Sequence, residues 1–200
     1  MDHYFTTAYN PDEIVELRKK AFFNKYQSKV NLEGLNWNKT DAHSHHFSYR
    51  YNYQLSSSLR ITFYQDIHKF NQATQIFWNN TEHGPYVLLA RAATLPEYKN
   101  LQLHSLLRIQ ALQFCLQNGV KNVYGSLQKK SNRLPKLLEA GYEILQTQSS
   151  WTESYLQNEG DVVLIGLMSQ NKIRNFIESE MAQITDFQTD AIQTLKPIIY

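Results

Sequence analysis

A strand, a turn and a helix follow one another without interruption between residues 87 and 116, and this order most constrains the fold. The apolar run that starts at Val87 ends at Thr94, and the turn after it contains Pro96-Glu97-Tyr98-Lys99. The following helix is predicted over residues 101–118. Its apolar stripe consists of Leu103, Leu107, Ala111 and Phe114. Because the first N–H groups of a helix have no partner within it, the start of this helix would attract a phosphate or another anion.

Upstream of this segment, the sequence predicts a helix and a hairpin. Asn10-Pro11-Asp12 is a helix start. The apolar face of that helix would carry Ile14, Leu17, Ala21 and Phe22. The hairpin is expected to have one strand at residues 46–54, a turn at residues 55–58 and a returning strand from Leu59.

Downstream, the pattern predicts a short strand at residues 120–127 and a helix at residues 134–140 that Gly141 ends. Two antiparallel strands, at residues 142–155 and 161–169, would surround a turn at residues 157–160. A last helix is expected over residues 171–185. Its apolar side would consist of Ile173, Phe176, Ile177 and Met181.

Length and composition indicate one enzyme-sized domain in the cytoplasm. At 200 residues the chain can bury one core, so we expect a domain over residues 1–169 and a helical extension over residues 170–200. The apolar runs are too short to cross a bilayer, and no basic-then-apolar signal opens the chain. The single cysteine, Cys115, is expected in the core and fits a reducing compartment.

The strand-turn-helix order resembles the GNAT superfamily of N-acyltransferases. The resemblance implies an α/β (α+β) fold with a mixed, mostly antiparallel sheet flanked by helices. It also implies that the acyl donor, acyl-CoA or acyl-phosphopantetheine, binds at the end of the strand and at the turn. The residues this assigns to donor binding are Ala93, Thr94, Lys99, Asn100, Leu101, Gln102, Leu103, His104 and Ser105. A bulge in the strand that ends at Ala92-Ala93-Thr94 would present N–H groups to the thioester carbonyl.

The chain departs from the GNAT pattern at three positions. Gln102 and His104 stand where the family carries glycines that let phosphates approach the backbone. Lys99, Ser105 and His104 could supply compensating donors. Leu137 stands where many members carry a tyrosine that acts as general acid, and an aliphatic side chain cannot donate a proton.

The amino-terminal half is similar to a narrower group, the acyl-homoserine-lactone synthases and the N-acyl amino acid synthases. The shared residues are Leu17-Arg18 ahead of Phe22, Asp41 five positions before His46, Arg60 on the returning strand, and Arg91 before the turn. Leu88 replaces an acidic residue that these relatives often have. The resemblance implies that His46, Arg60 and Arg91 form the catalytic and acceptor site, where the arginines could hold a carboxylate. It also implies a fatty acyl donor.

Several alternatives remain at this stage. The enzyme could instead be a short-chain acetyltransferase, or the domain could bind a ligand without catalysis. An acidic acyl carrier protein is a further donor, facing Lys99, Lys129, Lys130 and Arg133. We expect a small-molecule amine as acceptor, no nucleic acid and no metal, because His43 and His45 would point away from His46 on a strand. The apolar carboxyl-terminal segment is compatible with a homodimer.

Overall fold

One mixed sheet organises the protein, whose computed structural model describes residues 3–7, 10–26, 31–80, 83–153 and 156–184. In these residues, seven strands form the sheet in the order β1-β2-β3-β4-β5-β7-β6, and only the β4–β5 pair is parallel. The strands are β1 His3–Thr6, β2 His45–Tyr51, β3 Gln54–Tyr64, β4 Tyr86–Thr94, β5 Val123–Gln128, β6 Glu143–Glu153 and β7 Leu156–Leu167. The predicted α/β class, with a mostly antiparallel sheet flanked by helices, is confirmed.

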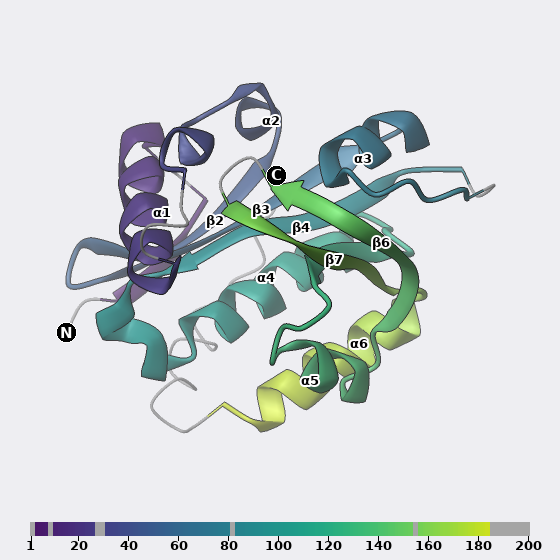
Figure 1. Cartoon of the computed structure of the whole chain (residues 1–200). Helices are drawn as coiled ribbons and strands as arrows, with labels where there is room; N and C mark the ends of the chain where they lie inside the picture. Colours follow the sequence, from purple (N-terminus) through teal and green to yellow (C-terminus); the bar gives the residue numbers. More distant parts are fainter. Residues whose placement is uncertain (1–2, 8–9, 27–30, 81–82, 154–155, 185–200) are drawn as a thin grey trace.

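Helices cover both faces of the sheet (Figure 1). On one side, here called the α1 face, lie α1 Pro11–Tyr26, α2 Lys39–Ala42 and α3 Ile67–Thr74. On the other side, the α4 face, lie α4 Leu103–Gln117, α5 Leu134–Glu139 and α6 Gln170–Ala182. The short 3-10 helices are η2 Glu33–Leu35 and η3 Pro96–Leu101.

The largest core lies on the α4 face. There α4 and α6 bury apolar side chains against alternate residues of the strands, as expected when a sheet face is covered by helices. The strand residues are Phe47, Tyr49, Leu59, Ile61, Val87, Val123, Val163, Ile165 and Leu167. Within this core Cys115 is fully buried, which raises the pKa of its thiol to about 12. The thiol is therefore a packing group, as predicted.

The predicted apolar face of α1 packs on the α1 face of the sheet. Ile14, Leu17 and Ala21 contact Leu55, Ala93 and Leu95 in a second core. The helix begins at Pro11, and the Asn10 side chain accepts a hydrogen bond from the N–H of Asp12 at 2.9 Å. These contacts fix α1 over the start of β3 and the end of β4.

The predicted hairpin forms, but its turn was placed wrongly. The chain reverses at Asn52 and Tyr53, which both have positive φ angles of 47° and 64°. Two such residues make the turn that suits the twist of a two-residue hairpin. Residues 55–58 lie inside β3, where Ser56, Ser57 and Ser58 are buried. Serine-rich sequence therefore marked a buried strand here and not a turn.

The carboxyl-terminal elements also differ in detail from the prediction. Residues 157–160 belong to β7, and β6 and β7 are joined at residues 154–155, outside the described part. Helix α6 begins after Ser169, whose hydroxyl accepts a hydrogen bond from the N–H of Lys172 at 3.1 Å. Ile173, Phe176 and Ile177 are buried as expected.

Met181 does not share the buried side of α6, because 38% of it is exposed to solvent. The apolar tail at residues 195–200 lies outside the described residues, so the expectation for it has no structural counterpart. Among the helices in the described ranges, none combines the length and the apolar character that crossing a bilayer requires.

Candidate functional site

Strands β4 and β5 separate soon after they meet. They pair only at Val87 with Val123 and at Leu88 with Tyr124, and the described residues show no later pair between them. Because β4 continues to Thr94 and β5 to Gln128, the rest of both strands diverges. The backbone of β4 on this side is therefore left without a strand neighbour over its second half.

A β-bulge lies in this second half of β4, which pairs with β3 alone. On β3, Ser58 pairs with Ala93 and Arg60 pairs with Ala90, so the single residue between them faces both Arg91 and Ala92. Arg91 has a φ of 54°, the left-handed conformation that a bulge of this kind uses. The expected bulge is thus present near the end of the strand. It re-aims the backbone at the point where β5 leaves β4.

The predicted donor turn follows directly. It is a 3-10 helix, Pro96–Leu101, and not the start of the long helix, which begins two residues later than predicted at Leu103. Gln102 separates the two helices with a φ of 50°, and its side chain makes no capping hydrogen bond. The N–H groups of Ser105 and Leu106 donate to the Gln102 carbonyl oxygen at 2.9 and 3.2 Å.

The residues assigned to the donor site fall into two groups. Lys99 and Asn100 are exposed on η3, and His104 contacts the Arg133 guanidinium at 2.5 Å across to α5. By contrast, Leu101 is partly buried and Leu103 is buried in the main core. The structure therefore brings together a polar rim around the start of α4, while the leucines anchor the turn.

The remaining two donor-site residues face opposite sides of β4. Ala93 is buried beneath α1. Thr94 Oγ1 lies 2.7 Å from Ser57 Oγ, and that hydroxyl also donates to the Ala93 carbonyl oxygen at 3.0 Å. The Ala93 methyl group thus packs against α1, and Ser57 holds the end of β4 against β3 through the Ala93 carbonyl oxygen and the Thr94 hydroxyl.

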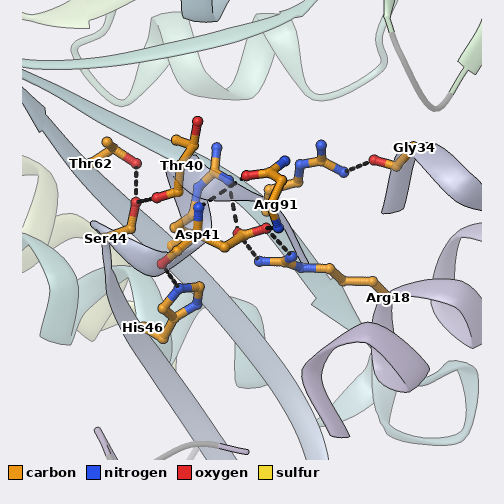
Figure 2. A network of polar contacts seen from close by, with 10 residues as sticks. Arg18, Gly34, Thr40, Asp41, Ser44, His46, Thr62 and Arg91 are labelled. Atoms are coloured by element: carbon orange, nitrogen blue, oxygen red, sulfur yellow. Dashed lines mark hydrogen bonds and ion pairs between the residues drawn. The ribbon is translucent and has the colours of Figure 1, made fainter. Parts of the chain in front are cut away.

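A buried charge network occupies the α1 face beside the bulge (Figure 2). Asp41 Oδ1 accepts hydrogen bonds from Arg18 Nη2 and Arg60 Nη1, both at 2.8 Å. Asp41 Oδ2 accepts from Arg18 Nη1 at 3.1 Å and from the Asn38 N–H at 3.2 Å. The carboxylate and both guanidiniums are at least nine-tenths buried. Helix α1, helix α2 and strand β3 are joined by this single carboxylate.

The electrostatics of the network follow from its composition. Burial alone would raise the pKa of Asp41, but the hydrogen bonds and positive charges of Arg18 and Arg60 outweigh it and lower the pKa to about 2. Burial lowers the pKa of Arg18, and the nearby charges of Arg91 and Arg60 lower it further, against the effect of Asp41. The Asp41 carboxylate is thus the counter-ion of both Arg18 and Arg60.

His46 lies in the same group, directly opposite Arg60 across the β2–β3 pair. Its Nε2 lies 2.9 Å from the Asp41 carbonyl oxygen, which can only accept, so this nitrogen donates. The ring stacks on Trp37 with centroids 4.7 Å apart. Burial lowers the pKa of His46 to about 4, despite the bond to Asp41. The imidazole is therefore neutral at pH 7, and its Nε2 is used in the hydrogen bond to the Asp41 carbonyl oxygen.

Arg91 extends from the bulge toward η2, where its Nη1 donates to the Gly34 carbonyl oxygen at 3.0 Å (Figure 2). It is less buried than Arg18 and Arg60. The structure therefore places His46, Arg60 and Arg91 on one face, with Arg91 nearest to the divergence of β4 and β5.

Two members of the group were not assigned to the site from the sequence. Arg18 donates both terminal nitrogens to Asp41, and Trp37 lies between the His46 ring and the Arg18 guanidinium, whose carbon is 6.0 Å from the indole centroid. Arg18 had two signals, the Leu17-Arg18 pair of the resemblance and its position on the apolar face of α1, four residues after Ile14. A cation at such a position needs a buried partner.

The three histidines diverge, although not as predicted. His43 does not belong to the strand, because it ends α2, and His45 contacts Phe114 of α4 at 4.9 Å between ring centroids. His46 points to the α1 face. Within the described ranges, no three side chains of the metal-ligating types converge.

Comparison with known proteins shows which solved structures share the fold. No protein-family model and no curated protein matches the sequence. Among solved structures, an N-acyl amino acid synthase from uncultured soil microbes, FeeM, is similar with a TM-score of 0.60 at 10% identity, over 92% of this chain and 99% of that one. The ribosomal-protein-S18-alanine N-acetyltransferase of Escherichia coli gives 0.56 at 13% identity, over 84% and 95%. An acetyltransferase of Bacillus subtilis, solved with CoA, gives 0.53 at 10% identity, over 84% and 99%. At such identities, the likeness shows a shared fold, that of the GNAT acetyltransferases.

Proposed function

We propose that the protein is an N-acyltransferase that moves an acyl group directly from a thioester donor to the amine of an acceptor that carries a carboxylate. The observation that carries the proposal is the bulge at Arg91 and Ala92, because it lies where β5 leaves β4 and is followed at once by the start of α4. Unpaired backbone and a helix amino terminus are the two features that a thioester with a phosphate-bearing carrier needs.

The donor would bind with its phosphates at the start of α4. The first N–H groups of this helix and its dipole favour an anion there, and Lys99 and the His104–Arg133 pair add polar groups around it. Acyl-CoA and an acyl carrier protein share this phosphopantetheine chemistry. We propose acyl-CoA or an acyl carrier protein as donor, with the exposed Lys129 and Lys130, which precede Arg133 in the chain, for an acidic carrier.

The transfer would occur at the bulge. The acceptor nitrogen attacks the thioester carbonyl carbon, a C–N bond forms, the C–S bond breaks, and the amine proton leaves as the thiolate departs. An N–H group of residues 91–93 would receive the developing oxyanion. Leu137 on α5 is partly buried against the main core, so it gives no proton to the thiolate. In this proposal, solvent or the acceptor itself supplies that proton.

The acceptor is proposed to carry a carboxylate because Arg91 places a guanidinium at the edge of the charge network, where its charge already acts on Arg18. Arg91 is less buried than Arg18 and Arg60, so it is the side chain that would reach the acceptor carboxylate. An amino acid fits both requirements, the amine and the anion.

His46 and Arg60 are proposed as positioning residues. Both hold Asp41 in place, and a His46 with a pKa of about 4 is too weak a base to deprotonate an ammonium group. The amine would therefore lose its proton to solvent before attack. This gives the reaction a rate that rises with pH toward the pKa of the acceptor amine.

The test is thiol release and product mass with acetyl-CoA, long-chain acyl-CoA and acyl carrier protein as donors, across a panel of amino acids and simple amines. We expect acylated amino acids, with simple amines reacting more slowly. Arg91→Gln should raise KM for amino acids at least tenfold, because the contact with the carboxylate is removed. KM for an amine that lacks a carboxylate should not change.

Lys99→Glu should raise KM for the donor, and Lys121→Glu is the matched control. Both lysines are exposed and flank α4, but Lys121 lies past its carboxyl end. Equal effects of the two changes would exclude binding of the donor at the start of α4. Donor binding without any turnover would indicate a binding module, and turnover of acetyl-CoA alone would indicate a short-chain acetyltransferase.

A further inference from the structure

Two buried serines lie side by side on the α1 face of the sheet. Ser48 of β2 pairs directly with Ser58 of β3, and both residues are 1% exposed. Among the described residues, neither hydroxyl has a hydrogen-bond partner. A buried hydroxyl without a hydrogen bond lowers the stability of the fold, so we expect two such neighbours to share a partner.

Two further donors border the same place. His46 and Arg60 form the next pair along β2 and β3 on this face, two residues from the serines. Arg60 Nε and Arg18 Nε are also buried and, within the described part of the chain, have no partner, although the terminal nitrogens of both side chains bind Asp41. The register therefore brings Ser48, Ser58 and Arg60 together, and Arg18 joins them from α1 because it binds the same Asp41 oxygen as Arg60.

The spacing of a sheet suits one small ligand among them. Opposed residues have Cβ atoms about 5 Å apart, and residues two apart on one strand are separated by about 7 Å. The middle of such a rectangle is roughly 4 Å from each Cβ, so a serine hydroxyl directed to it ends about 3 Å from the centre. That is the contact distance of a hydroxyl with a water molecule or a halide ion.

Charge distinguishes these two ligands. A single water could accept from the two Nε–H groups and donate to the two hydroxyls, but it would leave the positive charge of Arg18 and Arg60 in excess over Asp41. A buried uncompensated cation is far more costly than an unpaired hydroxyl. Because all four groups can donate, an anion without hydrogens can bind them all.

We infer that the protein holds a buried monovalent halide, chloride, between Ser48, Ser58, Arg60 and Arg18. The ion completes the charge balance of Arg18, Arg60 and Asp41. The inference does not depend on the proposed acyl transfer, since it concerns the folded state and is measured by stability.

The test compares thermal unfolding of the full chain in sodium chloride, sodium bromide and sodium gluconate at equal ionic strength. We expect Tm to be about 3–6 °C higher at a tenfold excess of chloride over the dissociation constant, and to keep rising with the logarithm of the chloride concentration above it. Bromide should act similarly, and its anomalous scattering in a crystal should place one ion between Ser48 and Ser58.

For the serine variants, the inference predicts the direction of the change in Tm. In gluconate, Ser48→Ala and Ser58→Ala should each raise Tm, because an unpaired hydroxyl is removed, and in chloride each should lose the halide-dependent gain. Ser56→Ala is the matched control, because this serine is equally buried on β3 but its hydroxyl donates to the Gln54 carbonyl oxygen at 3.0 Å. It should keep the full gain.

Two results would overturn the inference. Equal Tm values in chloride and gluconate would assign the place to water. A halide-dependent gain that survives in both Ser48→Ala and Ser58→Ala would move the ion elsewhere on the protein.

Discussion

Replacing Asp41 by asparagine should destabilise the fold strongly with almost no change in shape. The carboxylate accepts four hydrogen bonds, three of them from Arg18 and Arg60, and is fully buried. An amide of the same size leaves both guanidiniums buried without a counter-charge, and its Nδ2 faces a donor. Breaking a buried ion pair in this way costs about 3–5 kcal/mol. For a chain of this length, the loss corresponds to a Tm lower by about 6–20 °C.

Equilibrium urea unfolding of Asp41→Asn, followed by far-ultraviolet circular dichroism, measures the loss. Glu13→Gln is the matched control, since Glu13 also pairs with an arginine, Arg50, but is 39% exposed. That control should lose less than about 1 kcal/mol. A loss below about 1 kcal/mol for Asp41→Asn as well would refute the view that this carboxylate holds α1, α2 and β3 together.

Three further changes test other parts of the structure. Lowering the pH from 7 to 4.5 should lower the free energy of unfolding by about 2–3 kcal/mol through His46. The pKa of His46 is about 4 in the folded chain and near 6.5 in the unfolded chain, so the unfolded chain binds more protons in this range. In urea unfolding, His46→Gln should not show this dependence on pH. Gln102→Gly should raise stability by up to about 1 kcal/mol, by relieving a positive φ, and should lower KM for the donor, whereas Gln75→Gly, at a similar φ of 55°, should leave that KM unchanged. Phe176→Ala should cost about 3–5 kcal/mol, against less than about 0.5 kcal/mol for the exposed Met181→Ala; similar losses for both would show that α6 contributes little to the core.

Local patterns predicted the elements whose boundaries are marked by glycine, proline or a clear apolar stripe. Helix α4 carries its buried residues at helical spacing, and Gly119 and Gly141, with φ angles of 70° and 100°, end α4 and α5 as expected. The hairpin turn was missed because Asn52 and Tyr53 adopt positive φ without a glycine. Its neighbours, the serines of β3, are buried, which a turn-forming composition does not indicate.

The candidate site depended on contacts that sequence spacing does not encode. Asp41 and Arg18 are 23 residues apart and meet only because α1 and α2 cross the same face of the sheet. The resemblance to known enzymes pointed to Asp41, His46, Arg60 and Arg91, but not to the burial of the first three. That His46 is neutral follows from its surroundings in three dimensions, since an unperturbed histidine titrates close to neutrality.

Helix α6 joins the carboxyl-terminal part of the chain to α4, the helix that follows the donor turn. Gln170 Nε2 donates to the Val120 carbonyl oxygen just past one end of α4, and Glu180 lies 3.8 Å from Arg108 nearer the other end. With the sheet on its opposite side, α4 is held from Arg108 to its carboxyl end. The amides of this part should therefore exchange with deuterium only through global unfolding, whereas η3 and the first N–H groups of α4 exchange locally. Opening of the donor site would then be confined to η3 and the first turn of α4.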